Sequence, residues 1–119
     1  MPNVTVIGVV TMYAISAHLG NPLYCGGVYG PDQAPWVATD ASFADCGDVI
    51  GVWSGGVYRR FRARDRGPLG RYCVRWGDAC LPIGADVPEY HWWAEGISAR
   101  AIVTNETRVR REFERRAGR

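Results

Sequence analysis

The chain has 119 residues, of which 47% are apolar, and this size and composition fit a single globular domain and exclude a disordered chain. The formal net charge is only +2, and the excess of arginine lies in residues 104–119, where six arginines accompany three glutamates. Aromatic residues and arginines are not interleaved on one expected surface, so we do not expect a nucleic-acid partner. No run of about 18 apolar residues exists, and the first residues lack a basic segment followed by an apolar one. We therefore expect neither a membrane span nor a signal peptide in this chain.

The first half of the chain predicts short strands separated by breaker-rich loops. Residues 8–17 are rich in valine with aromatic and β-branched residues, which is typical of a strand. Residues 20–35 are rich in glycine and proline and cannot form a regular helix. Two strands are expected next, at 36–40 and 48–54. The second of these should continue through a Gly55-Gly56 hairpin turn into a strand whose arginines alternate with apolar residues, over 57–64.

The second half predicts a β-ribbon, a short helix, a last strand and a helical tail. Two runs, 71–75 and 79–83, flank a turn signal and should pair with each other. A short helix is expected over 88–95, with Asp86 or its neighbour as its cap and Gly96 as its end. A final strand should follow, and Asn105 should cap a terminal helix. We thus expect a small closed barrel in residues 1–103 and an arginine-rich helical tail in residues 104–119.

The four cysteines are an even number in a short chain, which predicts two disulfides if the protein works in an oxidising compartment. Cys25 paired with Cys46 would order the glycine-rich loop, and Cys73 paired with Cys80 would pin the ribbon. Their spacing fits no CxxC metal pattern, and only two histidines are present. We expect no metal and no cofactor.

Three segments resemble a known family. Asp65-Arg66-Gly67-Pro68-Leu69 resembles the Asp-Arg-Gly-Pro-Phe segment of rare lipoprotein A and related double-psi β-barrels. Ile83-Gly84-Ala85-Asp86-Val87-Pro88 looks like the family's Ile-Asp-Leu-Ser turn. Residues 37–50 are similar to the corresponding part of these barrels, and Asp40 matches the first aspartate of the bacterial 3D domain. The resemblance covers roughly residues 8–103.

The resemblance implies a fold, a substrate class and a candidate site. The fold would be mostly β, a small six-stranded double-psi β-barrel with one short helix and a C-terminal helical tail. Expansins and the lytic transglycosylase A catalytic domain share this barrel, so the implied partner is peptidoglycan or another cell-wall polysaccharide. The 3D domain is named for three aspartates, and Asp40, Asp65 and Asp86 follow in matching order.

Cleavage of a glycosidic bond needs a carboxyl group that delivers a proton to the leaving oxygen. We expect Asp86 to be this general acid, with Asp65 or Asp40 orienting it or stabilising the positive charge on the sugar. Two carboxyl groups in one cleft would repel each other, which raises the pKa of one of them. Each aspartate alone fits equally well a structural role, as the cap of a turn or of a helix.

Aromatic residues near these aspartates are candidates for sugar binding, since pyranose rings stack on flat apolar side chains. The alternatives are that one tryptophan of the 92–93 pair belongs to the core and that the histidine only packs. The expected substrate-binding residues are Trp76, Tyr90, His91, Trp92, Trp93 and, from the first motif, Arg66.

Three functions remain open at this point. The chain could be a peptidoglycan-cleaving lytic transglycosylase, or a non-catalytic, expansin-like glycan-binding module. The absence of a histidine after Thr39 and the altered turn at Asp86 favour the module. A structural component of a phage particle is the third. Each places the protein outside the cytoplasm, at the cell wall or in a virion.

Overall fold

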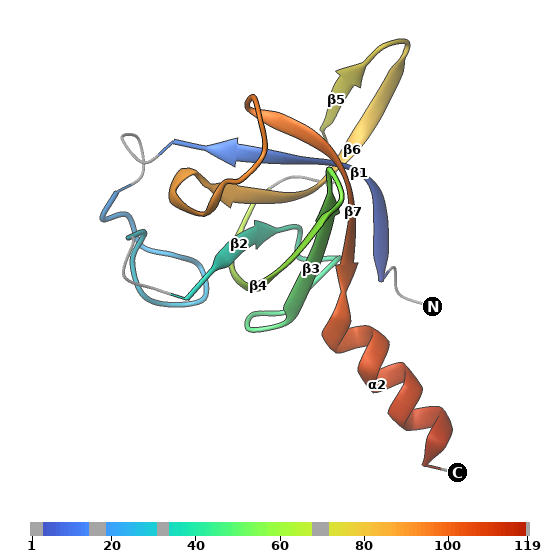
Figure 1. Ribbon diagram of the computed structural model, residues 1–119. Coiled ribbons are helices and arrows are strands. Elements are labelled where there is room, and N and C mark those ends of the chain that lie inside the picture. Colours follow the sequence, from blue (N-terminus) through green and yellow to red (C-terminus); the bar gives the residue numbers. More distant parts are fainter. Residues whose placement is uncertain (1–3, 15–18, 31–33, 68–71, 119) are drawn as a thin grey trace.

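A computed structural model describes residues 4–14, 19–30, 34–67 and 72–118 of the chain (Figure 1). It consists mainly of strands, with one short 3-10 turn at Glu89–His91 and a helix at the C-terminus. The strands are β1 (Thr5–Tyr13), β2 (Trp36–Thr39), β3 (Val49–Ser54), β4 (Val57–Arg66), β5 (Cys73–Trp76), β6 (Ala79–Pro88) and β7 (Ser98–Asn105), and the helix is α2 (Glu106–Ala117).

Six of the strands close into a barrel. Their order is β1-β7-β3-β4-β2-β6, and β6 pairs back onto β1. The pairs β1/β6 and β2/β4 are parallel, and the other pairs within the barrel are antiparallel. The seventh strand, β5, pairs only with the first part of β6, and the two form a ribbon that projects from the barrel (Figure 1). The predicted closed, mostly β barrel is therefore confirmed, and its strand arrangement is compatible with a double-psi barrel.

Side chains alternate between the inside and the outside of the barrel, as the pleat of a strand requires. The inside holds a single apolar cluster in which Ile50, Val52 and Phe61 are buried with residues from every strand of the barrel. Outside, a smaller cluster of Leu23, Tyr29 and Trp36 forms beneath the loop at residues 19–30. The inner face of the barrel wall thus forms the core, and the outer face can carry polar and functional side chains.

Both predicted disulfides are present, Cys25–Cys46 and Cys73–Cys80. The first ties the glycine-rich loop to the segment before β3, and the second closes the β5–β6 ribbon. The Gly55-Gly56 turn between β3 and β4 is also confirmed, and both glycines have positive φ, as a tight hairpin turn of this type requires.

The helix predicted over residues 88–95 is wrong. Strand β6 continues to Pro88 because its end pairs in parallel with β1, where Met12 and Tyr13 face Val87 and Pro88. Asp86 therefore lies inside a strand and caps no helix, and only the 3-10 turn follows. The first strand begins at Thr5, earlier than predicted, and residues 15–17 of the prediction lie outside the described residues.

Helix α2 confirms the prediction for the C-terminal tail. It spans Glu106–Ala117, and the side chain of Asn105 accepts a hydrogen bond from the amide of Arg108. The helix projects away from the barrel (Figure 1). Glu106 fixes its first turn, since its carboxylate lies 3.0 Å from Nε of Arg60 on β4. No helix among the described residues is long and apolar enough to cross a membrane.

Asn105 connects this helix to the barrel. Its side chain is fully buried, and Nδ2 donates to the carbonyl oxygen of Phe43 and to the carboxylate of Asp48, both at 2.9 Å. Asp48 is itself buried and accepts a hydrogen bond from the amide of Asp45. One amide group therefore joins the end of β7, the start of α2 and the loop before β3.

We expect Asn105→Ala to lower the free energy of unfolding by about 2–4 kcal/mol, because it removes a helix cap and takes one hydrogen-bond donor from a buried carboxylate and one from a backbone carbonyl. Urea denaturation measures this loss. Arg111→Ala, an exposed change on the same helix, is the control and should alter stability by less than about 0.5 kcal/mol. Equal effects of the two substitutions would contradict the role given to Asn105.

Candidate functional site

Two of the three predicted aspartates lie on one face of neighbouring strands. Ala38 on β2 pairs with Asp65 on β4 at one side and with Asp86 on β6 at the other. Residues paired across strands point to the same face, so both carboxylates leave the sheet on the side of Ala38. Two strand spacings separate their backbones, about 10 Å. Ala38 contributes only a methyl group between them, and this residue is itself buried.

The negative charges of both carboxylates act on Tyr13, at the end of β1. Burial raises the pKa of its phenol, and the negative charges of Asp65 and Asp86 raise it further. The phenol therefore stays protonated well beyond its ordinary range and is a neutral hydrogen-bond donor at physiological pH. Because the charges of Asp65 and Asp86 both affect the pKa of Tyr13, the three side chains belong to one local environment.

Each of these two carboxylates also has a defined protein contact. Thr11, two residues before Tyr13 on β1, donates from its hydroxyl to Oδ1 of Asp86 at 2.7 Å. The backbone amide of Tyr24 donates to Oδ1 of Asp65 at 3.0 Å. Tyr24 lies in the loop at residues 19–30, which we call the covering loop. Thr11 lies opposite Asp86 in the parallel β1–β6 register. The site is thus built from barrel strands and from the loop that Cys25–Cys46 holds in place.

Asp40, just after β2, makes local contacts of its own. Its carboxylate accepts hydrogen bonds from the amide and the hydroxyl of Ser42, at 2.9 and 2.8 Å, and its carbonyl oxygen accepts from Phe43. This is the turn-capping geometry of an aspartate that follows a strand. Asp40 borders a different depression, with Val6 and Gly84 among its lining residues. The contacts of Asp40 therefore match the structural alternative for this residue.

Arg66 is engaged in local contacts at the end of β4. Its guanidinium stacks over the ring of Tyr24 at 5.3 Å and donates to the carbonyl oxygen of Ala44. The side chain thereby connects the covering loop to the segment around residue 44. Of the matched motif, Pro68 and Leu69 lie outside the described residues.

An aromatic cluster adjoins the aspartate pair. Tyr29 packs edge-on against Tyr13, Trp36 and Tyr90, with ring centroids 5.3 to 5.4 Å apart. Burial, with the neighbouring Tyr90, raises the pKa of Tyr29 to about 12. The predicted residue Tyr90 thus belongs to this aromatic cluster beside the aspartates, which we call the aromatic floor. Sequence analysis did not identify Thr11 or Tyr13, although their alternation along one strand was visible.

The predicted residues His91, Trp92 and Trp93 line a pocket of about 350 Å³ that Tyr90 connects to this floor. Trp93 stacks on Phe61 with centroids 5.6 Å apart, and the guanidinium of Arg59 lies over the Trp93 ring, 5.6 Å from its centroid. Both tryptophans are only partly buried, so neither is a pure core residue. Trp92 donates from Nε1 to the carbonyl of Gly96, which fixes the turn before β7.

Trp76 lies at the exposed end of β5 on the ribbon. It shares a depression with Trp93, Glu95 and the Gly55 turn. The predicted aromatic residues therefore fall into a group beside Tyr90 and a separate residue, Trp76, on the ribbon. Among the described residues, no group of three or more His, Cys, Asp or Glu side chains is arranged to hold a metal ion.

This arrangement supplies the components of acid–base chemistry. Asp65 and Asp86 can carry or accept a proton, Thr11 orients one carboxylate, and Tyr13 offers a neutral donor near both. The adjoining aromatic rings offer flat apolar surface of the kind on which sugar rings stack.

His91 should make stability depend on pH. Burial lowers its pKa below the ordinary 6.5, so the unfolded chain takes up a proton at a higher pH than the native one. Stability is then complete above pH 6.5 and is lost as pH falls from there toward the lower pKa of the folded state. His91→Gln should remove this part of the acid destabilisation in urea midpoints measured from pH 7.5 to 5.5. His18→Gln is the control, and identical pH profiles for wild type and His91→Gln would refute the effect.

A comparison with protein-family models gives no match for this chain, and a comparison with curated proteins gives none either. The resemblance to double-psi barrels therefore stands on the motif residues and on the barrel itself.

Proposed function

We propose that the protein cleaves a cell-wall glycan, most closely in the manner of a lytic transglycosylase, at the Asp65–Asp86 pair of a double-psi barrel. The observation that carries this proposal is the pairing of both aspartates with Ala38 on one face. The charges of both aspartates also act on the phenol of Tyr13. The order of the aspartates in the sequence and the motif at Asp65 agree with it. Asp40 is left out of the proposed chemistry because its carboxylate holds its own turn.

Asp86 is the proposed general acid. In its protonated form it donates to the glycosidic oxygen, and the bond between that oxygen and the anomeric carbon breaks. The 6-hydroxyl of the muramic acid residue then attacks the same carbon and returns its proton to the Asp86 carboxylate. A 1,6-anhydro sugar forms, no water is consumed, and the acid is regenerated.

Asp65 and Tyr13 are the proposed supporting groups. A carboxylate on the same face stabilises the positive charge that develops at the anomeric carbon. The neutral phenol of Tyr13 can donate to a carboxylate without adding charge. Thr11 orients the Asp86 carboxyl through its 2.7 Å hydrogen bond.

One observation favours a second function, a non-catalytic and expansin-like glycan-binding module. The Asp65 carboxylate accepts a hydrogen bond from the backbone amide of Tyr24. It therefore has a structural role, which is to hold the loop at residues 19–30 against the barrel. A groove with this organisation binds glycan through aromatic rings and hydrogen bonds without turnover. In either case, two disulfides agree with an oxidising environment, and we propose a location outside the cytoplasm, at the cell wall or on a virion.

Product analysis tests the proposal. Purified peptidoglycan is incubated with the protein, and mass spectrometry should detect anhydromuropeptides. Asp86→Asn should reduce their release by at least about 100-fold, since it removes the general acid. Asp65→Asn should reduce it less.

Asp78→Asn is the matched control, because Asp78 is an exposed aspartate at the turn of the ribbon. It should release products at the wild-type rate. Unchanged release by Asp86→Asn would exclude the proposed acid. Binding of the wild type to sacculi with no products would reject the enzyme and support the binding module.

A further inference from the structure

Three depressions on the outside of the barrel are neighbours, because each shares lining residues with the next. The pocket at His91 and Trp92 shares Trp93 with a second depression of about 520 Å³, which extends to Trp76 on the ribbon. The second depression shares Ser54, Gly55 and Arg100 with a third, of about 230 Å³. We call these three connected depressions the tryptophan trough.

Four of the five tryptophans line this trough, in the order Trp92, Trp93, Trp76 and Trp53. The exposed fractions of Trp53 and Trp76 are 49% and 39%, whereas the fifth tryptophan, Trp36, is fully buried. These rings follow one path instead of lying singly on the surface, and contiguous exposed apolar groups of this kind mark binding sites. Trp53 and Trp76 lie outside the inner core, whereas Trp92 and Trp93 also pack against it.

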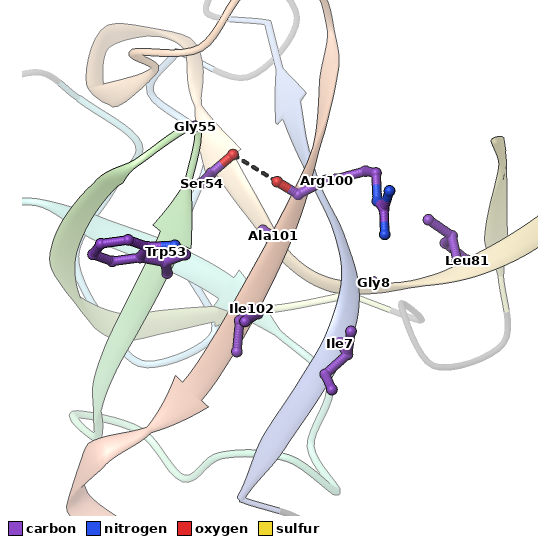
Figure 2. A pocket seen from close by; sticks show the side chains of 9 residues that line it. All are labelled: Ile7, Gly8, Trp53, Ser54, Gly55, Leu81, Arg100, Ala101 and Ile102. Atoms are coloured by element: carbon purple, nitrogen blue, oxygen red, sulfur yellow. Dashed lines mark hydrogen bonds between the residues drawn. The ribbon is translucent and has the colours of Figure 1, made fainter.

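The third depression lies on the outward face of three antiparallel strands (Figure 2). Ile7, Ile102 and Trp53 face one another in register across β1, β7 and β3. Figure 2 shows these side chains side by side on the sheet, with the guanidinium of Arg100 extending toward Leu81. The result is a shallow, flat surface, with Tyr58 continuing it at 6.3 Å from Trp53.

The charged groups of the trough are mainly cationic. Arg59 stacks over Trp93 in the first depression, and Arg100 borders the other two. Neither arginine forms an ion pair within the described part of the chain. Glu95 is the acidic residue among the lining side chains of the three depressions. Two unneutralised guanidinium groups between aromatic rings favour an anionic ligand.

We infer that the tryptophan trough binds an extended polysaccharide strand that carries carboxylates. Sugar rings stack on the successive tryptophans, and Arg59 and Arg100 pair with acidic substituents of the strand. A protein partner fits less well, because protein interfaces concentrate their aromatic anchors near one centre, whereas these four are spread along a path. The inference rests on the proposed function for the identity of the polymer, which is a glycan of alternating N-acetylglucosamine and N-acetylmuramic acid.

The trough also relates to the aspartate pair. Its first depression includes Tyr90, which packs on the aromatic floor beside Asp65 and Asp86. A strand held in the trough therefore leads toward the proposed site of cleavage. Its far end, at Trp53, binds at a distance and increases affinity for long strands more than for short fragments.

Co-sedimentation and affinity electrophoresis test the inference with peptide-free glycan strands from peptidoglycan, and with chitin, which lacks the carboxylate, for comparison. Trp53→Ala and Trp76→Ala should each weaken binding to the strands about 10-fold, the loss expected of an exposed aromatic contact. Arg100→Gln should reduce the preference for strands over chitin. Phe113→Ala changes a still more exposed aromatic, on helix α2, and is the control that should bind as wild type. Circular dichroism confirms that each variant is folded.

The outcomes separate this inference from the proposed catalysis. Asp86→Asn should lose product release and keep full strand binding. Strand binding by a wild type that releases no product would remove the catalytic proposal and leave the trough. Trp53→Ala and Trp76→Ala that bind like wild type, or a wild type that binds neither polymer, would overturn the trough. Sedimentation showing a dimer that Trp53→Ala dissociates would also overturn it, in favour of an interface between copies.

Discussion

The parallel pairing of β1 with β6 is the constraint on which the rest of this structure depends. It closes the barrel and sets Thr11 opposite Asp86 and Met12 opposite Val87. The two strands approach so closely that a Cβ at Gly8 would overlap the carbonyl oxygen of Pro82, so only glycine fits there. A shift of one residue in this register would turn Asp86 toward the core and Val87 toward the outer face.

Closure also divides the molecule into two chemical layers. The inner layer holds the main apolar cluster, and its burial stabilises the barrel. The outer wall over β1, β2, β4 and β6 can therefore hold aspartates, a threonine and tyrosines. A loop fixed by Cys25–Cys46 covers part of this wall and brings the amide of Tyr24 to Asp65.

The sequence predicted features that depend on short stretches of chain. The turn at Gly55-Gly56, the cap at Asn105 and the pairing of Cys73 with Cys80 across a ribbon are local, and all three are confirmed. The helix after Asp86 failed because its sequence is compatible with a helix, while a distant strand, β1, holds those residues extended. Local propensity is overridden wherever a long-range strand pair competes with it.

The candidate site shows the same division. Asp65 and Asp86 were predicted from their motifs, and the register brings them to the same face, although sequence order placed Asp40 with them equally well. Tyr13 was missed because its proximity to both aspartates arises only when β1 and β6 pair. The linear sequence contains the residues of a site that spans four strands, but not the register that assembles them.

Titration of Tyr13 tests most directly whether Asp65 and Asp86 share one environment. Tyrosine labelled with carbon-13 at Cζ reports ionisation by NMR, and the Tyr13 signal is assigned with Tyr13→Phe. In the wild type, Tyr13 should stay protonated well above the ordinary pKa of 10. Asp65→Asn and Asp86→Asn should each lower this pKa, and the double variant should lower it most, because each removes a negative charge that faces the phenol. A Tyr13 pKa that neither substitution changes would contradict the shared site.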